Sequence, residues 1–368
     1  MPILLYGATG YTGRLVTAEL VRLGLPFTLS GRNPTKLTEL AATAGRGAPW
    51  AAAAADDPAA LRNLLADASV VINCAGPFTL AGDALPAAAA ETGTHYVDST
   101  GEQTFMQHVF EDHGDTAART GAALVPAMGF DYAPGDCLAR LVCAGAEPVN
   151  ELVIAYAVQG FGMTRGTLRS GLEMLGGDTL VYRDGDWRPQ ERGVLRSWFT
   201  FPAPLGRQRM SRYPAGEVVT VPRHTRVRSI TTLLTTATTV PQPRAAALMT
   251  YAEPLLAAAL RTPLRQVAHD AIGLLPEGPP EDHRRGARFT ICAVARGDDG
   301  LVRRGVLHGE DIYGLTAASL SWAAHQMSAP AYDRRGALGA AAAFDPAGFL
   351  GAMAPHGISY DLDPADPA

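Results

Sequence analysis

The chain has 368 residues, enough for two domains that each bury a hydrophobic core. Its 31 basic and 36 acidic residues give a net charge of −5, which argues against a nucleic-acid-binding function. The four cysteines form no C-x-x-C pair and the nine histidines form no H-x-x-x-H pair, so we expect reduced thiols and no metal site.

The distribution of apolar residues indicates a cytoplasmic protein. The chain does not open with a basic segment followed by an apolar core, as a signal peptide would. The most apolar later stretch, residues 245–260, is interrupted by Glu253 and Pro254 and falls short of a membrane span. We therefore expect no stable membrane insertion.

The start of the chain has the pattern of a strand, a glycine-rich turn and a helix. Residues 2–6 are apolar and have the length of a buried strand, and Val16, Leu20 and Leu23 recur on one face of a helix. Between them lies Gly7-Ala8-Thr9-Gly10-Tyr11-Thr12-Gly13. Glycines let the backbone approach a pyrophosphate, and the N-terminus of the following helix favours that anion. We predict a dinucleotide-binding unit; the alternative is an ordinary tight turn.

The end of the second expected strand, residues 27–30, indicates which dinucleotide binds. NAD-binding units carry an Asp or Glu there, which bonds to the ribose 2′-hydroxyl. This chain has Ser30-Gly31-Arg32, with Lys36 one helical turn later. An arginine can grip a 2′-phosphate, and Asn33-Pro34 is typical of a helix start beside it. We predict NADP over NAD; the alternative is that Arg32 and Lys36 only coat a solvated helix.

Strands and helices continue to alternate as far as residue 127. Further strands are expected at 50–55, 70–73, 95–98 and 122–127, which argues for an α/β fold of the Rossmann type with a doubly wound parallel sheet. Ligands bind outside the carboxyl ends of such strands. The segments expected to border the cofactor there are Asp56, Cys74-Ala75-Gly76-Pro77, Asp98-Ser99 and Gly129-Phe130-Asp131.

The order of these motifs resembles that of the saccharopine-dehydrogenase-like NADP-binding family. The motifs are the glycine turn, Gly31-Arg32, Cys74-Ala75-Gly76-Pro77, His95-Tyr96-Val97-Asp98 with Gly101-Glu102, and Gly129-Phe130-Asp131. Within that family the chain looks most similar to the trans-acting enoyl reductase group. The resemblance is strong over residues 1 to about 140 and weaker beyond.

This resemblance implies an NADP-binding Rossmann domain over residues 1–130 and an inserted α+β domain over 131–307. The insertion would shape the substrate site and a homodimer interface, and residues 308–368 would return to the first domain. Two segments depart from the family pattern where substrate is expected to sit. Tyr132-Ala133 and Gly135 stand in place of two serines, and residues 163–167 in place of Ser-Gly-Gly-Thr. The identity of the substrate therefore stays open.

Several side chains are candidates for substrate chemistry. Arg165 and Arg169 flank an expected helix start at Thr167 and can hold a negative substrate group; the alternative is that both arginines are surface charges. Asp131 is a further candidate for a substrate contact. Tyr132 can donate a proton, or it can be a packed tyrosine. Lys36 is the only lysine, which excludes a Tyr-x-x-x-Lys pair and lysine Schiff-base chemistry elsewhere in the chain.

The second half of the chain is expected to be α+β. Expected elements are a strand at 151–158, a helix at 167–175, antiparallel strands within 177–240, a helix at 245–260, a hairpin of 287–294 with 301–307, a helix at 313–327, and a loosely ordered tail after Ser359. Arginines at 188, 192, 196, 207, 209 and 212 surround Trp198 and Phe199. This basic segment can dock an acidic carrier protein, but a solvated loop is favoured because Pro189 and Gly193 interrupt it.

Together these patterns predict an NADPH-dependent reductase that delivers hydride to a polarised double bond, and the resemblance to the enoyl reductase group implies that this is a C=C bond of an enoyl thioester. A small-molecule substrate, free or bound to a carrier protein, is implied. The saccharopine branch of the family implies reduction of a C=N bond of an imine instead. A non-catalytic NADP-sensing protein is the third hypothesis.

Overall fold

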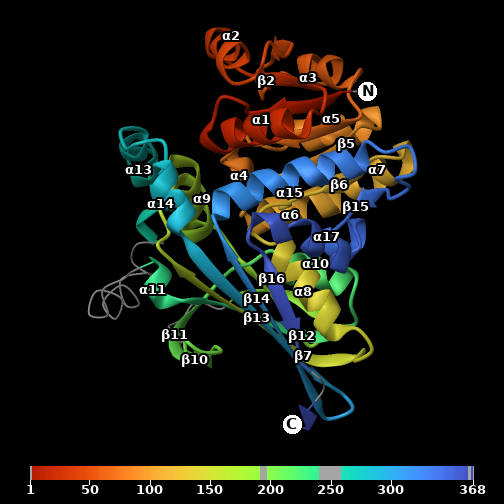
Figure 1. Cartoon of the computed structure of the whole chain (residues 1–368), viewed down its shortest axis with the longest axis vertical. Coiled ribbons are helices and arrows are strands. Elements are labelled where there is room, and N and C mark those ends of the chain that lie inside the picture. The colour runs from red at the N-terminus through yellow and green to blue at the C-terminus, as the bar shows by residue number, and fades with distance from the viewer. Residues whose placement is uncertain (1, 191–196, 240–257, 364–365, 368) are drawn as a thin grey trace. The chain divides into compact units, whose positions relative to one another are not determined.

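The computed structural model describes residues 2–190, 197–239, 258–363 and 366–367 (Figure 1). The chain divides into two compact units. The first comprises Met1–Ala133 and Tyr313–Phe344, and the second comprises Pro134–Ile312 and Asp345–Ala368. Only part of the expected returning segment, 308–368, therefore packs with the first unit.

The first unit is built on a seven-stranded parallel sheet with the order β15-β6-β5-β4-β1-β2-β3. The strands are β1 (Ile3–Tyr6), β2 (Phe27–Gly31), β3 (Trp50–Ala52), β4 (Val70–Asn73), β5 (His95–Asp98), β6 (Ala123–Val125) and β15 (Gly336–Ala337). β2 and β3 follow β1 on one side of the sheet, and the chain then crosses to the other side of β1, where it forms β4, β5, β6 and β15. This confirms the predicted Rossmann-type sheet and places its switch point between β1 and β4.

Helices connect the strands of the first unit. They are α1 (Tyr11–Leu23), α2 (Pro34–Thr43), α3 (Pro58–Leu65), α4 (Phe78–Ala81), α5 (Ala84–Thr92), α6 (Gln103–His108), α7 (Gly114–Thr120), α15 (Ile312–Met327) and α16 (Ala340–Ala343). A π-helical segment, η1 (Val109–His113), joins α6 to α7. The apolar faces of these helices pack on the sheet around Leu4, Leu61 and Val71, which are all buried.

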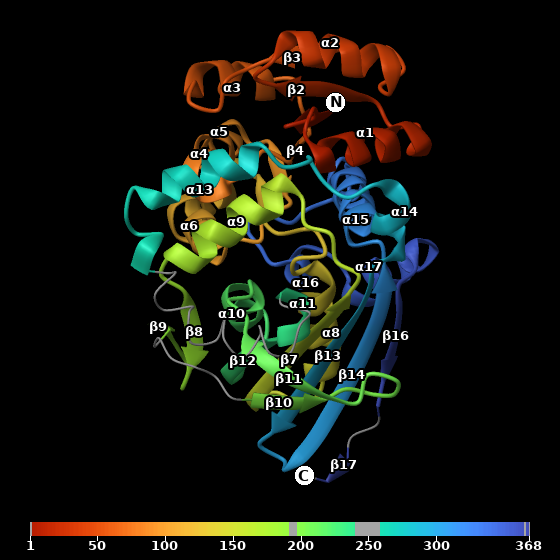
Figure 2. The same ribbon diagram turned by 90° about the vertical axis from the view of Figure 1, so that its left-hand side faces the viewer.

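The second unit is built on a mixed ten-stranded sheet, whose main path is β10-β11-β12-β7-β13-β14-β16. Its strands are β7 (Val149–Gln159), β8 (Leu180–Arg183), β9 (Asp186–Pro189), β10 (Ser197–Thr200), β11 (Arg207–Arg212), β12 (Val227–Thr235), β13 (Arg288–Gly297), β14 (Leu301–Glu310), β16 (Ser359–Leu362) and β17 (Asp366–Pro367). Figure 2 shows β13 and β14 side by side as the predicted hairpin, with β16 along the outer edge of β14.

Helices and single turns complete the second unit. They are α8 (Ala133–Cys143), α9 (Arg165–Gly176), α10 (Glu217–Thr220), η2 (Val221–Arg223), α11 (Thr236–Thr239), α13 (Leu264–Gly273), α14 (Glu281–Gly286), α17 (Pro346–Ala352) and η3 (Ala354–His356). The expected helix at 245–260 lies mostly outside the described residues. Among the residues that the structure describes, none of the helices is long and apolar enough to cross a membrane.

The antiparallel strands expected within 177–240 are confirmed by the pairs β8–β9, β10–β11 and β11–β12. β12 also runs parallel to β7, because the chain passes through α9 and the outer strands before it returns. Two other expectations for this unit were wrong. The basic segment forms β9, β10 and β11 rather than a solvated loop, although residues 191–196 lie outside the described part. The tail after Ser359 pairs with β14, which satisfies backbone groups that an edge strand leaves open.

Candidate functional site

Two positions in and after the turn that follows β1, Gly7 and Gly13, have no room for a side chain. Gly7 has a φ of +76°, and a Cβ there would lie 2.8 Å from the backbone nitrogen of Ala75. A Cβ on Gly13 would lie 2.3 Å from the carbonyl oxygen of Gly7. Since real Cβ atoms do not approach backbone so closely, both positions need glycine. The turn is thereby held against the segment that follows β4, at the switch point of the sheet.

The helix that follows this turn begins without a side-chain cap. Gly10 occupies the N-cap of α1 in extended conformation and offers no side-chain acceptor. By contrast, Asn33 caps α2 and Asp57 caps α3, each by accepting a backbone N–H, at 3.1 and 3.0 Å. No side chain among the described residues caps the start of α1, and this arrangement is compatible with a pyrophosphate at that helix N-terminus.

The turn after β4 is fixed by the side chains of Asn73 and Glu102, for which the sequence patterns indicated no such role. Asn73 accepts a hydrogen bond from the Ala75 N–H at 3.0 Å and donates to the Tyr96 hydroxyl at 3.1 Å. Glu102 is buried and accepts from the backbone N–H groups of Phe78 and Thr79, at 2.9 and 2.7 Å. These contacts hold both ends of Cys74-Ala75-Gly76-Pro77, in which the Gly76–Pro77 bond is cis.

The end of β2 carries the residues expected at a 2′-phosphate. Ser30 is buried and donates to the Ala51 carbonyl at 2.8 Å, so its side chain holds β2 to β3. Arg32 and Lys36 are exposed, and the Asn33 cap forms as predicted. Burial raises the pKa of Tyr6, at the end of β1, while the charge of Arg32 opposes that rise. The positive charge of Arg32 therefore lies close enough to the carboxyl ends of the strands to affect the pKa of a group there.

Asp56 lies exposed after β3, and its charge also acts on Tyr6. No carboxylate occupies the end of β2 itself, where an NAD-binding unit would carry one. The geometry thus fits a dinucleotide whose adenosine ribose bears a 2′-phosphate.

Asp98 and the half-buried Cys74, at the ends of β5 and β4, both have raised pKa values. Asp98 is fully buried at the end of β5, and its Oδ1 accepts from the N–H groups of Thr100 and Ala127, both at 2.8 Å. Burial raises the pKa of Asp98 to about 7 despite these bonds. Burial and the Asp98 charge raise the pKa of the Cys74 thiol to about 12. Cys74 is therefore a protonated thiol at neutral pH and a poor nucleophile.

The residues after β6 lie in the first unit with their side chains turned to the β5 turn. The Tyr132 side chain is buried, and its hydroxyl donates to the Gly101 carbonyl at 2.8 Å. The Asp131 carboxylate also lies beside Gly101. This contact of Tyr132 is the one expected of a packed tyrosine. Its catalytic role stays a prediction.

In the second unit, the candidate arginines lie on α9. This helix begins at Arg165, two residues before the expected start, and the Thr164 side chain caps it by accepting from the Thr167 N–H at 3.0 Å. The Arg165 guanidinium donates to the Leu275 carbonyl, and the Arg169 guanidinium lies against Gly273. The structure thus brings all three candidates to one end of α9 and engages Arg165 with a neighbouring loop.

Another residue beside the glycine turn comes from far along the chain. The ring of Tyr313, in α15, meets the ring of Tyr11 edge-on with centroids 5.3 Å apart. Tyr11 belongs to the glycine motif, so α15 supports the turn from outside. No local signal in the sequence links these two tyrosines, because 301 positions separate them (313 − 11 − 1).

Comparisons with known proteins identify the first unit. Residues 3–128 match the family model described as the saccharopine dehydrogenase NADP binding domain. A protein of Mycobacterium leprae named as a trans-acting enoyl reductase is 41% identical over 140 residues, which cover 36% of this chain and 33% of that protein. A protein of Arabidopsis thaliana named as a mitochondrial saccharopine dehydrogenase-like oxidoreductase is 35% identical over 148 residues, again 36% and 33% of the two chains.

The chain thus spans about a third of the length of these relatives. A solved structure, apo saccharopine dehydrogenase (L-Glu forming) from Saccharomyces cerevisiae, has a TM-score of 0.59 over 99% of this chain and 100% of its own. At 12% identity that likeness shows the fold alone. The family match and the geometry agree: the first unit contains a saccharopine dehydrogenase NADP-binding domain, and its cofactor is NADP.

Proposed function

We propose that the protein is an NADPH-dependent oxidoreductase that reduces a polarised C=C bond of an enoyl metabolite of the thioester type. The observation that carries the proposal is the nucleotide site, where α1 begins uncapped and Arg32 stands in place of an acid. The name of the M. leprae relative supports the C=C bond as the target.

The chain's own residues hold and orient the reactants in this proposal. NADPH supplies a hydride when it is bound. The N–H groups of α1 bind its pyrophosphate, and Arg32 with Lys36 binds its 2′-phosphate. The Cys74 thiol stays protonated, and Lys36 is the only lysine. We therefore propose a reduction without covalent attachment of substrate to the protein.

Tyr132 is the candidate proton donor. To protonate a substrate, its hydroxyl would exchange the bond to Gly101 for one to the reacting atom. Because that bond is formed within a buried turn, solvent is the competing source of the proton. Asp131 lies beside the same turn and is our candidate for a polar contact to substrate.

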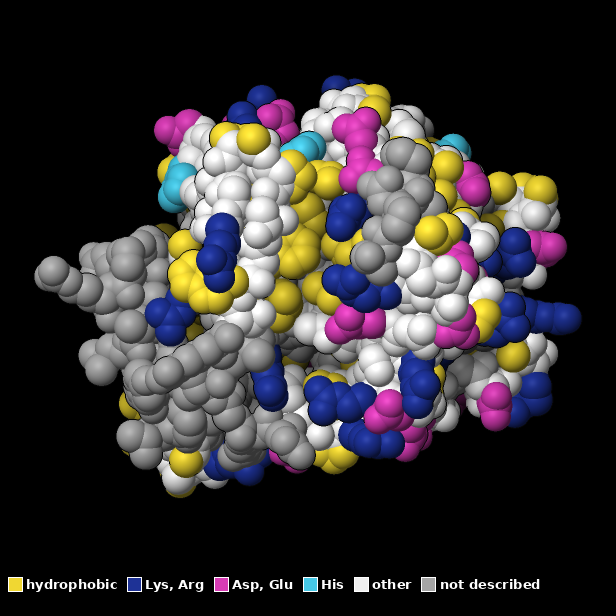
Figure 3. Space-filling view, turned by 90° about the horizontal axis from the view of Figure 1, so that it is seen from below, with side chains coloured by type: hydrophobic (Ala, Val, Ile, Leu, Met, Phe, Trp, Pro, Cys, Tyr) yellow, Lys and Arg dark blue, Asp and Glu magenta, His cyan; other side chains and the backbone are white. Residues whose placement is uncertain are grey.

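For the second unit we propose that Arg169 and Thr167, with Arg165, anchor a negative group of the substrate. We also propose that the second unit docks a carrier protein and forms a homodimer interface. The candidate docking segment has Trp198 exposed, with the Arg207 guanidinium 4.9 Å from its ring centroid. Arg188 forms an ion pair with Asp184 at 3.8 Å, so part of the segment's charge is neutralised. Basic and acidic side chains also alternate on the face seen in Figure 3.

Reduction of a C=N bond is the second candidate, and the name of the A. thaliana relative favours it. A protonated iminium accepts hydride with less help from a dedicated acid, which suits a site without a Tyr-x-x-x-Lys pair. A non-catalytic NADP sensor would bind the cofactor without turnover.

Incubation of the protein with NADPH and one of three substrate panels separates these functions. The panels are enoyl thioesters, cyclic imines and keto acids, and the readout is the absorbance of reduced nicotinamide. We expect oxidation with enoyl thioesters, and loss of that oxidation in a variant unable to bind NADPH. Oxidation with imines alone would replace the enoyl proposal. NADPH binding without oxidation by any panel would identify a sensor.

A further inference from the structure

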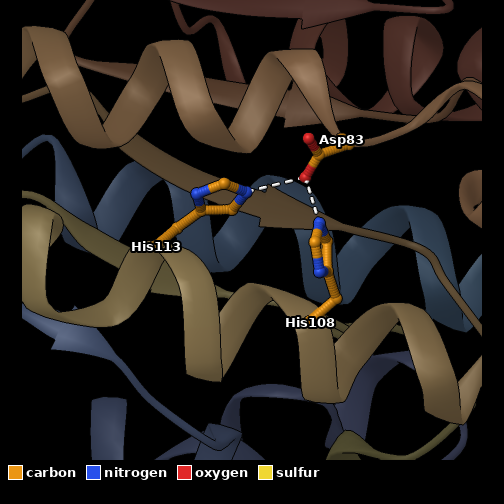
Figure 4. A group of neighbouring side chains, drawn as sticks. All are labelled: Asp83, His108 and His113. Carbon is orange, nitrogen blue, oxygen red and sulfur yellow. Dashed lines mark hydrogen bonds and ion pairs between the residues drawn. The ribbon is translucent and has the colours of Figure 1, made fainter.

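Three metal-ligating side chains converge on the surface of the first unit. Asp83 precedes α5, His108 ends α6, and His113 ends η1 (Figure 4). One oxygen of Asp83, Oδ1, lies 2.6 Å from His108 Nε2 and 2.7 Å from His113 Nε2. The candidate ligand atoms all lie within 4.8 Å of one another. The two imidazole rings stand edge to face, with centroids 5.4 Å apart.

The π-helical segment brings the two histidines to the same side. In a regular α-helix, residues five apart are separated by about 140° around the axis. Between His108 and His113 the chain forms η1, in which hydrogen bonds run from residue i to residue i+5. Residue i+5 therefore lies closer to the face of residue i than it would in a regular α-helix. Such π segments concentrate at functional sites. The H-x-x-x-H pattern does not include this pair, because its spacing is five.

A fourth side chain fixes the orientation of His108. The Nδ1 atom of His108 contacts a carboxylate oxygen of Asp112, while Nε2 faces Asp83. A neutral imidazole carries one hydrogen, so if Nδ1–H is donated to Asp112, Nε2 presents a lone pair. That lone pair faces an anionic oxygen, an arrangement that requires a cation, either a proton or a metal ion, between the two. A carboxylate on the far nitrogen is the usual partner of a metal-bound histidine.

We propose that Asp83, His108 and His113 form a three-ligand site for a divalent transition-metal ion, with Zn²⁺ the best fit. Two imidazoles and one carboxylate match the nitrogen and oxygen ligands of zinc, and a water completes a tetrahedron. Bonds of about 2.0–2.2 Å place ligand atoms roughly 3.3 Å apart, so the carboxylate must move outwards by less than about 1 Å. The Asp83 side chain is 57% exposed and can do so.

The site would act as a clip within the first unit. Asp83 lies between α4 and α5, shortly after the Cys74-Ala75-Gly76-Pro77 turn, whereas both histidines belong to the later helical segment. A metal that binds only the folded chain stabilises that fold by mass action. We therefore expect Zn²⁺ to raise the melting temperature of the first unit.

The site is tested with the full chain, purified without a histidine tag and stripped of metal by a chelator. Zn²⁺ is titrated in competition with a chromophoric chelator, and Co²⁺ serves as a spectroscopic probe of tetrahedral coordination. We expect the wild type to bind one equivalent of Zn²⁺ tightly. His325→Asn, a control at an exposed histidine of α15 in the same unit, should do the same. His113→Asn and Asp83→Asn should lose this binding, and Asp112→Asn should bind 10–100-fold more weakly.

Circular dichroism of each variant shows whether it is folded. Asp83→Asn keeps the test valid if His113→Asn, at a less exposed position, does not fold. Wild-type protein that binds no Zn²⁺, or equal affinity in the wild type and Asp83→Asn, would overturn the proposal.

Discussion

Substitution of Gly13 by alanine tests the construction of the nucleotide site. The added Cβ would lie 2.3 Å from the Gly7 carbonyl oxygen and 2.7 Å from the Ala8 carbonyl oxygen. An unstrained contact needs about 3.4 Å, so the turn or the helix must shift by roughly 1 Å. Overpacking of this kind lowers the free energy of unfolding by about 1–3 kcal/mol. Alanine has a higher helix propensity than glycine, which offsets about 1 kcal/mol of that loss.

We therefore expect Gly13→Ala to lower the free energy of unfolding by up to about 2 kcal/mol and NADPH affinity at least tenfold. The assays are urea unfolding followed by circular dichroism and titration of NADPH by fluorescence. Gly171→Ala is the matched control, since Gly171 lies within α9 and a Cβ there has no neighbour within 4 Å. That variant should be as stable as the wild type or more so. Full stability and full NADPH affinity in Gly13→Ala would refute the reasoning.

Three further predictions concern titration and catalysis. The pKa of Asp98 is raised by burial to about 7, so the folded state holds its proton more tightly than the unfolded state. As pH rises from about 4 to 7, the wild type should lose roughly 3 kcal/mol of stability relative to Asp98→Asn, and a pH-independent difference would contradict this. Tyr132→Phe should lower kcat, because it removes the proposed proton donor, and should lose about 1 kcal/mol of stability with the bond to Gly101; full kcat in this variant would remove Tyr132 from the mechanism. Arg169→Ala should raise KM at constant kcat, while an unchanged KM would remove it from the substrate site.

Much of the first unit could be predicted because its signals are local. Short apolar runs mark β1 and β4, and an Asn-Pro pair marks the capped start of α2, which the structure confirms. The pairing of distant segments leaves no such mark. Nothing near residue 227 indicates that β12 lies parallel to β7, and the polar residues of β16 do not reveal that β14 lacks a partner on that edge.

The nucleotide site divides in the same way. The glycine turn and Arg32 could be predicted from the sequence, because their spacing follows from how a strand, a turn and a helix bind a phosphate. Glu102 and Tyr313 also shape the site, but their roles depend on segments that folding brings to them. The histidine pair was missed for a local reason: η1 changes the helical period, and no residue pattern around 109–113 marks a π segment.

The central claim is that the first unit binds NADP through the end of β2. Its most direct test is a titration of the wild type and Arg32→Ala with NADPH and with NADH. We predict that the wild type prefers NADPH, and that Arg32→Ala loses at least tenfold in NADPH affinity, the scale of a lost charge-assisted contact, while NADH binding stays nearly unchanged. Equal titration curves for the two cofactors with the wild type would contradict the account.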